Sequence, residues 1–127
     1  MSGLYAIQDH GEWWAYGRDT SNNRYTPLQQ ITPENFAKLE LVAQWDLPSN
    51  KVPIWEMPNK QFGPNEGTPV KVGSFLYTVT AASQVAKFDL DTLAPALDAD
   101  GNAIVYDPEI YKAYSVSQIG FMHRGLI

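Results

Sequence analysis

The middle of the chain alternates apolar and polar residues, which predicts short strands. Val70, Val72 and Leu76 alternate with polar neighbours, and the turn signal Gly73-Ser74 interrupts them. We expect successive strands over 68–77 and 77–88, a third over 84–90 and a fourth over 103–106. Asp100-Gly101, before the fourth strand, is the strongest hairpin signal. The pattern predicts a four-stranded antiparallel meander.

The flanking segments carry weaker patterns. Residues 12–28 show no period and read as an ordered loop pinned by aromatic side chains. Thr32 and Pro33 are typical of the N-cap and first position of a short helix ending at Leu39. A strand is expected over 41–47, a connecting loop over 49–65, and a loop or short helical turn over 108–117. The last ten residues are apolar and favour entry into a further strand.

A single sheet of four strands cannot bury both of its faces. Such a unit normally stacks on copies of itself, yet the 127 residues hold no second copy. The chain is therefore expected to be an incomplete fold. The alternative is a stand-alone β module that binds or assembles with a partner and has no catalytic activity.

Composition narrows the classes of function. A hydrophobic content of 44% with 18% charged residues is typical of a globular protein. The net charge of −5 argues against nucleic acid or an anionic membrane as a partner. The absence of cysteine excludes disulfides and thiolate chemistry, and His10 and His123 lack metal-ligand spacing.

Glu66 and Arg124 are the candidate site residues of this pattern. Glu66 precedes the first strand of the meander, and Arg124 lies in the apolar C-terminal stretch. A carboxylate and a guanidinium at two strand entrances could line a pocket for an anion, whereas a solvated acid and a surface arginine are the plainer alternatives. The aspartates around Asp100-Gly101 lack the remaining ligands of a calcium loop and are better explained as turn residues.

Four stretches, in the right order, resemble the N-terminal part of the pyrroloquinoline-quinone (PQQ) dependent dehydrogenases, which are eight-bladed β-propellers. Their motif residues are Trp14-x-Tyr16-Gly17-Arg18-Asp19 with Arg24-Tyr25-Thr26-Pro27-Leu28, then Leu39-x-x-Val42-Ala43-x-Trp45, then Glu66-Gly67-Thr68-Pro69-Val70, and finally His123-Arg124-Gly125-Leu126. The resemblance implies an all-β fold in which residues 13–47 close the last blade and 66–106 form the first blade. Residues 107–127 would then lead into a strand facing the cofactor, and 1–127 would be one incomplete propeller segment.

The same resemblance implies a function. Glu66 and Arg124 would contact PQQ, and Gln118 would lie near it; the Ca²⁺ ligands and the catalytic Asp would come from later blades, so no catalytic or metal-binding residue is assigned here. The complete enzyme would oxidise alcohols, polyols or sugars and pass electrons to a cytochrome or quinone. It would work in the periplasm, although no secretory signal is visible, and the isolated chain would be inactive. Its partners would be the remaining blades or a second polypeptide.

Three departures from the family pattern stand out. Gln118 and Ile119 occupy the place where many alcohol-oxidising members have adjacent cysteines, and Gly120 the place where glucose-oxidising members often have His. The docking motif "A-x-D-x-x-T-G" is replaced by Lys87-Phe88-Asp89-Leu90-Asp91-Thr92-Leu93, and Ile104 stands near the expected Trp. These changes leave the subclass open and predict weaker packing between blades at this point.

Overall fold

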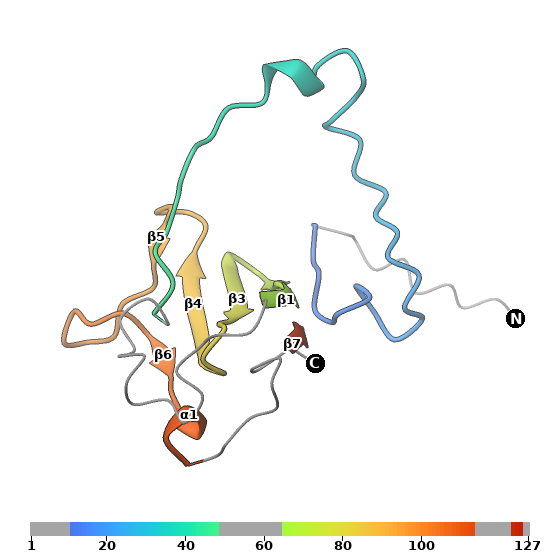
Figure 1. The fold of residues 1–127 in the computed structure, drawn as a ribbon. Coiled ribbons are helices and arrows are strands. Elements are labelled where there is room, and N and C mark those ends of the chain that lie inside the picture. The colour runs from blue at the N-terminus through green and yellow to red at the C-terminus, as the bar shows by residue number, and fades with distance from the viewer. Residues whose placement is uncertain (1–10, 49–64, 114–122, 126–127) are drawn as a thin grey trace, which may run out of the picture.

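Short strands make up most of the regular structure. The computed structural model describes residues 11–48, 65–113 and 123–125 (Figure 1). The elements, in chain order, are the 3₁₀ helix η1 (Phe36–Lys38), β1 (Asn65–Thr68), β2 (Val70–Val72), β3 (Phe75–Val79), β4 (Val85–Asp89), β5 (Ala94–Pro95), β6 (Val105–Tyr106), α1 (Ile110–Ala113) and β7 (His123–Gly125). Both helices are a single turn, and no described helix is long and apolar enough to cross a bilayer. The expected all-β class is confirmed.

An antiparallel sheet forms the centre of the molecule. β2 pairs with β3 and β3 with β4, and the far edge of β4 carries both β5 and β6. Gly73, with a φ of 58°, makes the tight β2–β3 turn where the sequence predicted one. Strand pairing of Leu76 with Phe88 and of Thr78 with Ala86 places these four residues on one face of the sheet.

The outer strand is split in two, which corrects the expected count of four strands. Lys87 bonds to both halves: its N–H donates to the Ile104 carbonyl at 3.2 Å, and its carbonyl accepts from the Ala96 N–H at 3.0 Å. Between these points residues 97–103 leave the edge as a small hairpin closed by the Leu97–Ala103 bridge. Gly101, with a φ of 82°, confirms the predicted turn. An excursion of this kind shortens the exposed edge that could pair with another sheet.

The buried core is small. Its apolar members are Val70, Val79, Ala82, Ala86, Phe88, Ala96 and Tyr111. A longer set of large apolar side chains is exposed, including Leu41 at 81%, Val42 at 75% and Tyr106 at 68%. Apolar surface on this scale normally lies against another protein surface. The described part of the chain therefore agrees with a unit that needs neighbours.

The N-terminal segment is attached to the edge of β2. Trp13 and Lys71 exchange two backbone hydrogen bonds, at 3.0 and 2.6 Å. The Glu12 carboxylate accepts from the Gly73 N–H at 3.0 and 3.1 Å and from Lys71 Nζ at 3.2 Å. These bonds satisfy part of an otherwise open strand edge.

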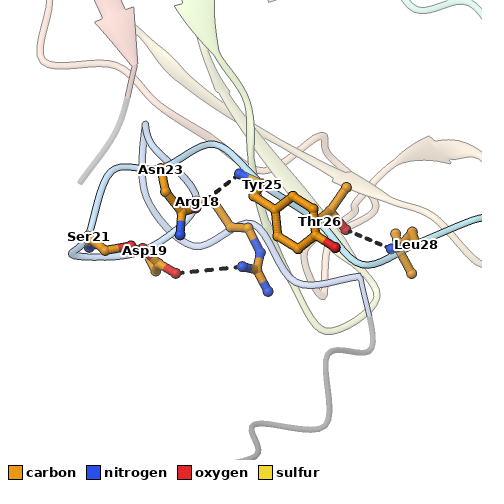
Figure 2. Close-up of polar contacts among 7 residues, drawn as sticks. All are labelled: Arg18, Asp19, Ser21, Asn23, Tyr25, Thr26 and Leu28. Atoms are coloured by element: carbon orange, nitrogen blue, oxygen red, sulfur yellow. Dashed lines mark hydrogen bonds and ion pairs between the residues drawn. The ribbon is translucent and has the colours of Figure 1, made fainter.

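The loop that follows is irregular, as expected, but side-chain hydrogen bonds to the backbone shape it more than aromatic packing does. Asp19 accepts from the Ser21 N–H and Asn23 from the Tyr25 N–H, while the Arg18 guanidinium lies 3.6 Å from the Asp19 carboxylate (Figure 2). The aromatic contribution is the Arg24 guanidinium 4.5 Å from the Tyr16 ring centre.

Two predicted elements differ in the structure. The expected helix ending at Leu39 is reduced to a turn followed by η1, and Asn35, not Thr32, precedes its first residue. Asn35 Oδ1 accepts from the Thr32 N–H at 2.8 Å and its Nδ2 donates to the Gln30 carbonyl at 2.7 Å. These bonds favour a tight turn over a regular helix.

The predicted strand over 41–47 is not part of a sheet. Its burial alternates as a strand's would from Val42 to Leu47, with Ala43, Trp45 and Leu47 half-buried and Val42, Gln44 and Asp46 exposed. The described residues contain no strand that pairs with it. The chain leaves the sheet after Trp13, which is bonded to β2, arches away from it and returns beside it at this segment (Figure 1), where Trp45 anchors it by stacking on Phe88 at a 4.6 Å ring-centre distance.

Candidate functional site: a parallel strand pair between β1 and β7

β1 and β7 bring together the two ends of the predicted site. They pair in parallel, with Asn65 opposite His123 and Thr68 opposite Gly125. Two residues of β1, Glu66 and Gly67, therefore oppose the single residue Arg124 of β7, which is a β-bulge. Bulges are frequent beside active sites because they redirect the chain locally. The backbones of Glu66 and Arg124, far apart in sequence, are thus neighbours across one strand pair.

Proline separates this strand pair from the antiparallel sheet. Pro69 stands between β1 and β2 and has no N–H to give to a ladder. The chain therefore changes partner at this residue: β1 pairs with β7, and β2 pairs with β3. Both β1 and β7 also contact β3, so the candidate site is supported by the central sheet.

The residue types suit an anionic ligand. An arginine can hold a carboxylate or a quinone oxygen with two parallel N–H donors, and a glutamate offers acceptors for ring N–H or hydroxyl groups. Gln118, the third predicted residue, lies outside the described residues. Within the described ranges no cluster of three or more His, Asp or Glu side chains could hold a metal ion.

Aspartates shape the turns on either side of β5. Asp89 Oδ1 accepts from the N–H groups of Asp91 and Thr92, and Asp98 Oδ1 accepts from those of Asp100 and Asn102. The bond from the Asn102 backbone is the main reason that the pKa of Asp98 lies below its usual value. One oxygen of each carboxylate is therefore engaged with the backbone, as expected of turn residues.

A cavity of about 460 Å³ lies on the sheet face that carries Phe88. Its wall includes Ala86 and Phe88 from β4, Tyr111 from α1 and Asp46 from the N-terminal segment. Ile104 and Asp107, which flank β6, also line it. Sequence reasoning missed Gln84, Asp107 and Tyr111, which are joined by hydrogen bonds here. The only local signal was Asp107-Pro108, a common way to begin a turn.

Comparison with known proteins identifies the family. Residues 13–112 match the family model described as "PQQ: Glucose/ethanol/alcohol dehydrogenase, beta-propeller domain". The chain is 43% identical over 79 residues to the glycerol dehydrogenase large subunit of Gluconobacter thailandicus. The aligned residues make up 62% of this chain and 10% of that protein. It is 33% identical over 101 residues to the 1-butanol dehydrogenase (cytochrome c) of Thauera butanivorans. These residues make up 79% of this chain and 12% of that protein.

A third relative is the dehydrogenase subunit of the alcohol dehydrogenase (quinone) of Gluconobacter oxydans, 37% identical over 82 residues, which cover 65% of this chain and 9% of that protein. Because the family model covers most of the chain, the chain belongs to the PQQ-dependent β-propeller dehydrogenases, and its antiparallel sheet is a propeller blade. The chain spans about a tenth of the length of the curated relatives it matches.

Proposed function

We propose that this chain is the N-terminal part of a PQQ-dependent dehydrogenase that oxidises alcohols, polyols or sugars. The observation that carries the proposal is the bulged strand pair, which puts Arg124 opposite Glu66 and Gly67 in a chain of this family. Two strands that pair with each other and contact β3 of the blade give the site a fixed support on which a planar cofactor can be oriented. PQQ supplies the redox chemistry, and the protein residues bind and orient it.

In this proposal Arg124 contacts the carboxylates or quinone oxygens of PQQ, Glu66 contacts it from the first blade, and Gln118 lies nearby. The donor set fits the group, since PQQ carries three carboxylates and arginine binds such groups in a bidentate fashion. Ca²⁺ and the catalytic Asp belong to parts of the propeller beyond these residues. Electrons leave to a cytochrome or a quinone, in line with the names of two relatives. The enzyme works in the periplasm.

In this proposal residues 13–47 close the propeller by adding a strand to its last blade. Two observations support it. Residues 41–47 alternate in burial as a strand does, yet pair with no described strand. Trp45 fixes their position through Phe88 and through a 2.9 Å bond from its Nε1 to the Leu93 carbonyl.

The test is PQQ binding to the complete polypeptide that carries this segment. Removing a charge-assisted hydrogen bond costs about 1.5–3 kcal/mol, so Arg124→Lys and Glu66→Gln should each weaken PQQ binding by about tenfold or more. The matched controls are Arg24→Lys and Glu40→Gln, which change exposed residues and should leave the affinity unchanged. Binding is measured by titrating the apoenzyme with PQQ and following the quenching of protein fluorescence.

Each outcome is informative. A wild-type polypeptide that does not bind PQQ would overturn the proposed function and favour the alternative of a non-catalytic blade module. A wild type that binds PQQ, with both site variants binding equally well, would instead reject Glu66 and Arg124 as cofactor contacts. The 127-residue chain alone, given PQQ and Ca²⁺, should reduce no dye.

A further inference from the structure

Lys87 places a cation on an aromatic face of the sheet, opposite to the face that carries Phe88. Its strand partner is Tyr77, and Phe75 lies two residues before Tyr77 on β3, so these three side chains share one face. Lys87 Nζ lies 3.6 Å from the centre of the Phe75 ring and 5.8 Å from the centre of the Tyr77 ring. Both distances are those of a cation–π contact, so the two rings hold the ammonium group over the sheet.

No described carboxylate forms an ion pair with Lys87. Two other lysines do have acidic partners, with Nζ–Oε1 distances of 3.2 Å for Lys71–Glu12 and 2.7 Å for Lys112–Glu109. Asp89 shares the face with Lys87, but its Oδ1 accepts from backbone N–H groups of the turn that follows it. The Lys87 ammonium group therefore has N–H donors that no oxygen in the described part of the chain accepts.

The face around Lys87 is apolar and partly uncovered. Strand pairing places Val72 of β2 and Tyr106 of β6 on the same face as Lys87, which is itself half-buried. Val72 is 48% exposed and Tyr106 is 68% exposed. Because β2 and β6 lie at opposite edges of the sheet, the exposed apolar surface extends to both sides of Lys87.

A sheet that covered this face would have to satisfy the cation. Burial removes water from the ammonium group, and a buried charge without a partner is costly. An aliphatic or aromatic cover would leave the N–H donors of Lys87 without acceptors, whereas a carboxylate provides both the opposite charge and the acceptors. Lys87 stands where the docking motif of the family has alanine, so this requirement arises from a residue in which this chain departs from the motif.

We propose that a neighbouring sheet of the complete polypeptide covers the face that carries Phe75, Tyr77 and Lys87, and that an acidic side chain of this sheet pairs with Lys87. The rings position the ammonium group, and the carboxylate neutralises it. The partner is thus a β-sheet with an Asp or Glu opposite Lys87. The inference rests on the proposed function only in taking the chain as part of a longer propeller, and it is independent of the contacts proposed for PQQ.

The first test is cross-linking of the complete folded polypeptide with a water-soluble carbodiimide, which joins an amine to a carboxylate only where the two are in contact. Peptide mapping by mass spectrometry should show Lys87 linked to an Asp or Glu outside the 127 residues. The ion pairs Lys71–Glu12 and Lys112–Glu109 are internal controls, since both should be linked in the same sample.

The second test measures the melting temperature of variants of the complete polypeptide. Lys87→Met keeps an apolar stem beside the two rings but leaves the partner carboxylate buried without a cation, so the melting temperature should fall by about 2 °C or more. Exchanging the charges, by Lys87→Glu together with a lysine substitution of the cross-linked acid, should recover at least half of this loss. Lys38→Met, at an exposed residue, is the control and should melt as the wild type does.

Either of two results would overturn the proposal. One is a sample in which both control pairs are linked and Lys87 is joined to no acid outside the 127 residues. The other is a Lys87→Met variant that melts at or above the wild-type temperature, which would mean that the rings alone hold the ammonium group. Failure of the complete polypeptide to bind PQQ would count against the proposed function and leave the cross-linking result standing.

Discussion

At the residue scale, Leu93 shows how this blade differs from the family repeat. It stands where the docking motif has glycine, and it keeps the conformation that glycine would adopt, with a φ of 54°. The Asp89 carboxylate holds the preceding residues by bonding to their N–H groups, and the Leu93 carbonyl accepts from Trp45. The fold therefore preserves the turn although the residue suited to it is missing.

Leu93→Gly should consequently stabilise the chain. A non-glycine residue in the left-handed region costs about 1–2 kcal/mol, and glycine loses about 0.5–1 kcal/mol of this gain through backbone entropy. The residue is 42% exposed, so the loss of its partial burial offsets part of this gain, and we expect the free energy of unfolding to rise by no more than about 0.5 kcal/mol in urea titrations. Leu97→Gly is the matched control, since Leu97 is exposed and has no positive φ; it should destabilise. If Leu93→Gly and Leu97→Gly lowered the free energy of unfolding by equal amounts, the prediction would be wrong.

At the element scale, sequence reasoning succeeded where the signal was local. The turns at Gly73 and Gly101 need residues that tolerate positive φ, and both were predicted from the residues that form them. β5 was missed because two residues carry no period. Nothing local pairs β1 with β7: the sequence offered a pocket lined by Glu66 and Arg124 as one alternative, the family resemblance gave both residues a cofactor contact, and only the structure supplies the register and the bulge between them. The residues 41–47 have a strand pattern without a described partner strand, since pairing depends on residues elsewhere.

The docking of α1 on the blade should depend on pH through Tyr111. Burial, followed by its hydrogen bond to Asp107, raises the pKa of Tyr111 above its usual value of 10.0. A pKa that is higher in the folded than in the unfolded state gives stability that is complete below about pH 10 and is lost as the pH rises through the folded value. The free energy of unfolding should therefore fall above pH 10 in the wild type.

Tyr111→Phe removes this titration and one hydrogen bond, so it should lower stability by about 1 kcal/mol near pH 7 and flatten the alkaline decline. Urea titrations between pH 7 and 11 measure both effects. Tyr106→Phe, at a side chain that is 68% exposed, is the control and should keep the wild-type decline. If Tyr111→Phe declines as steeply as the wild type, then another group is responsible.

At the scale of the whole molecule, the exposed apolar residues and the unpaired segment 41–47 both indicate that the described part of the chain lies against further protein surface. The blade buries few large side chains, and Leu41 and Val42 are exposed on a segment that is anchored only a few residues later, at Trp45. In the proposed function this segment extends a sheet of another blade, which supplies its missing backbone hydrogen bonds. The rest of a propeller contains such a sheet.

Proline substitutions distinguish a donated strand from a linker. Alternate N–H groups of a strand face its partner, so Leu41→Pro or Val42→Pro must remove a ladder bond, at a cost of about 3 kcal/mol, if residues 41–47 join another blade. In the 127-residue chain neither variant should change stability by more than about 0.5 kcal/mol, because no described backbone bond involves these two residues. In the complete polypeptide one of the two should lower the melting temperature by several degrees. Equal tolerance of both prolines in both proteins would show that the segment is a linker, and closure of the propeller would then have to come from elsewhere in the polypeptide.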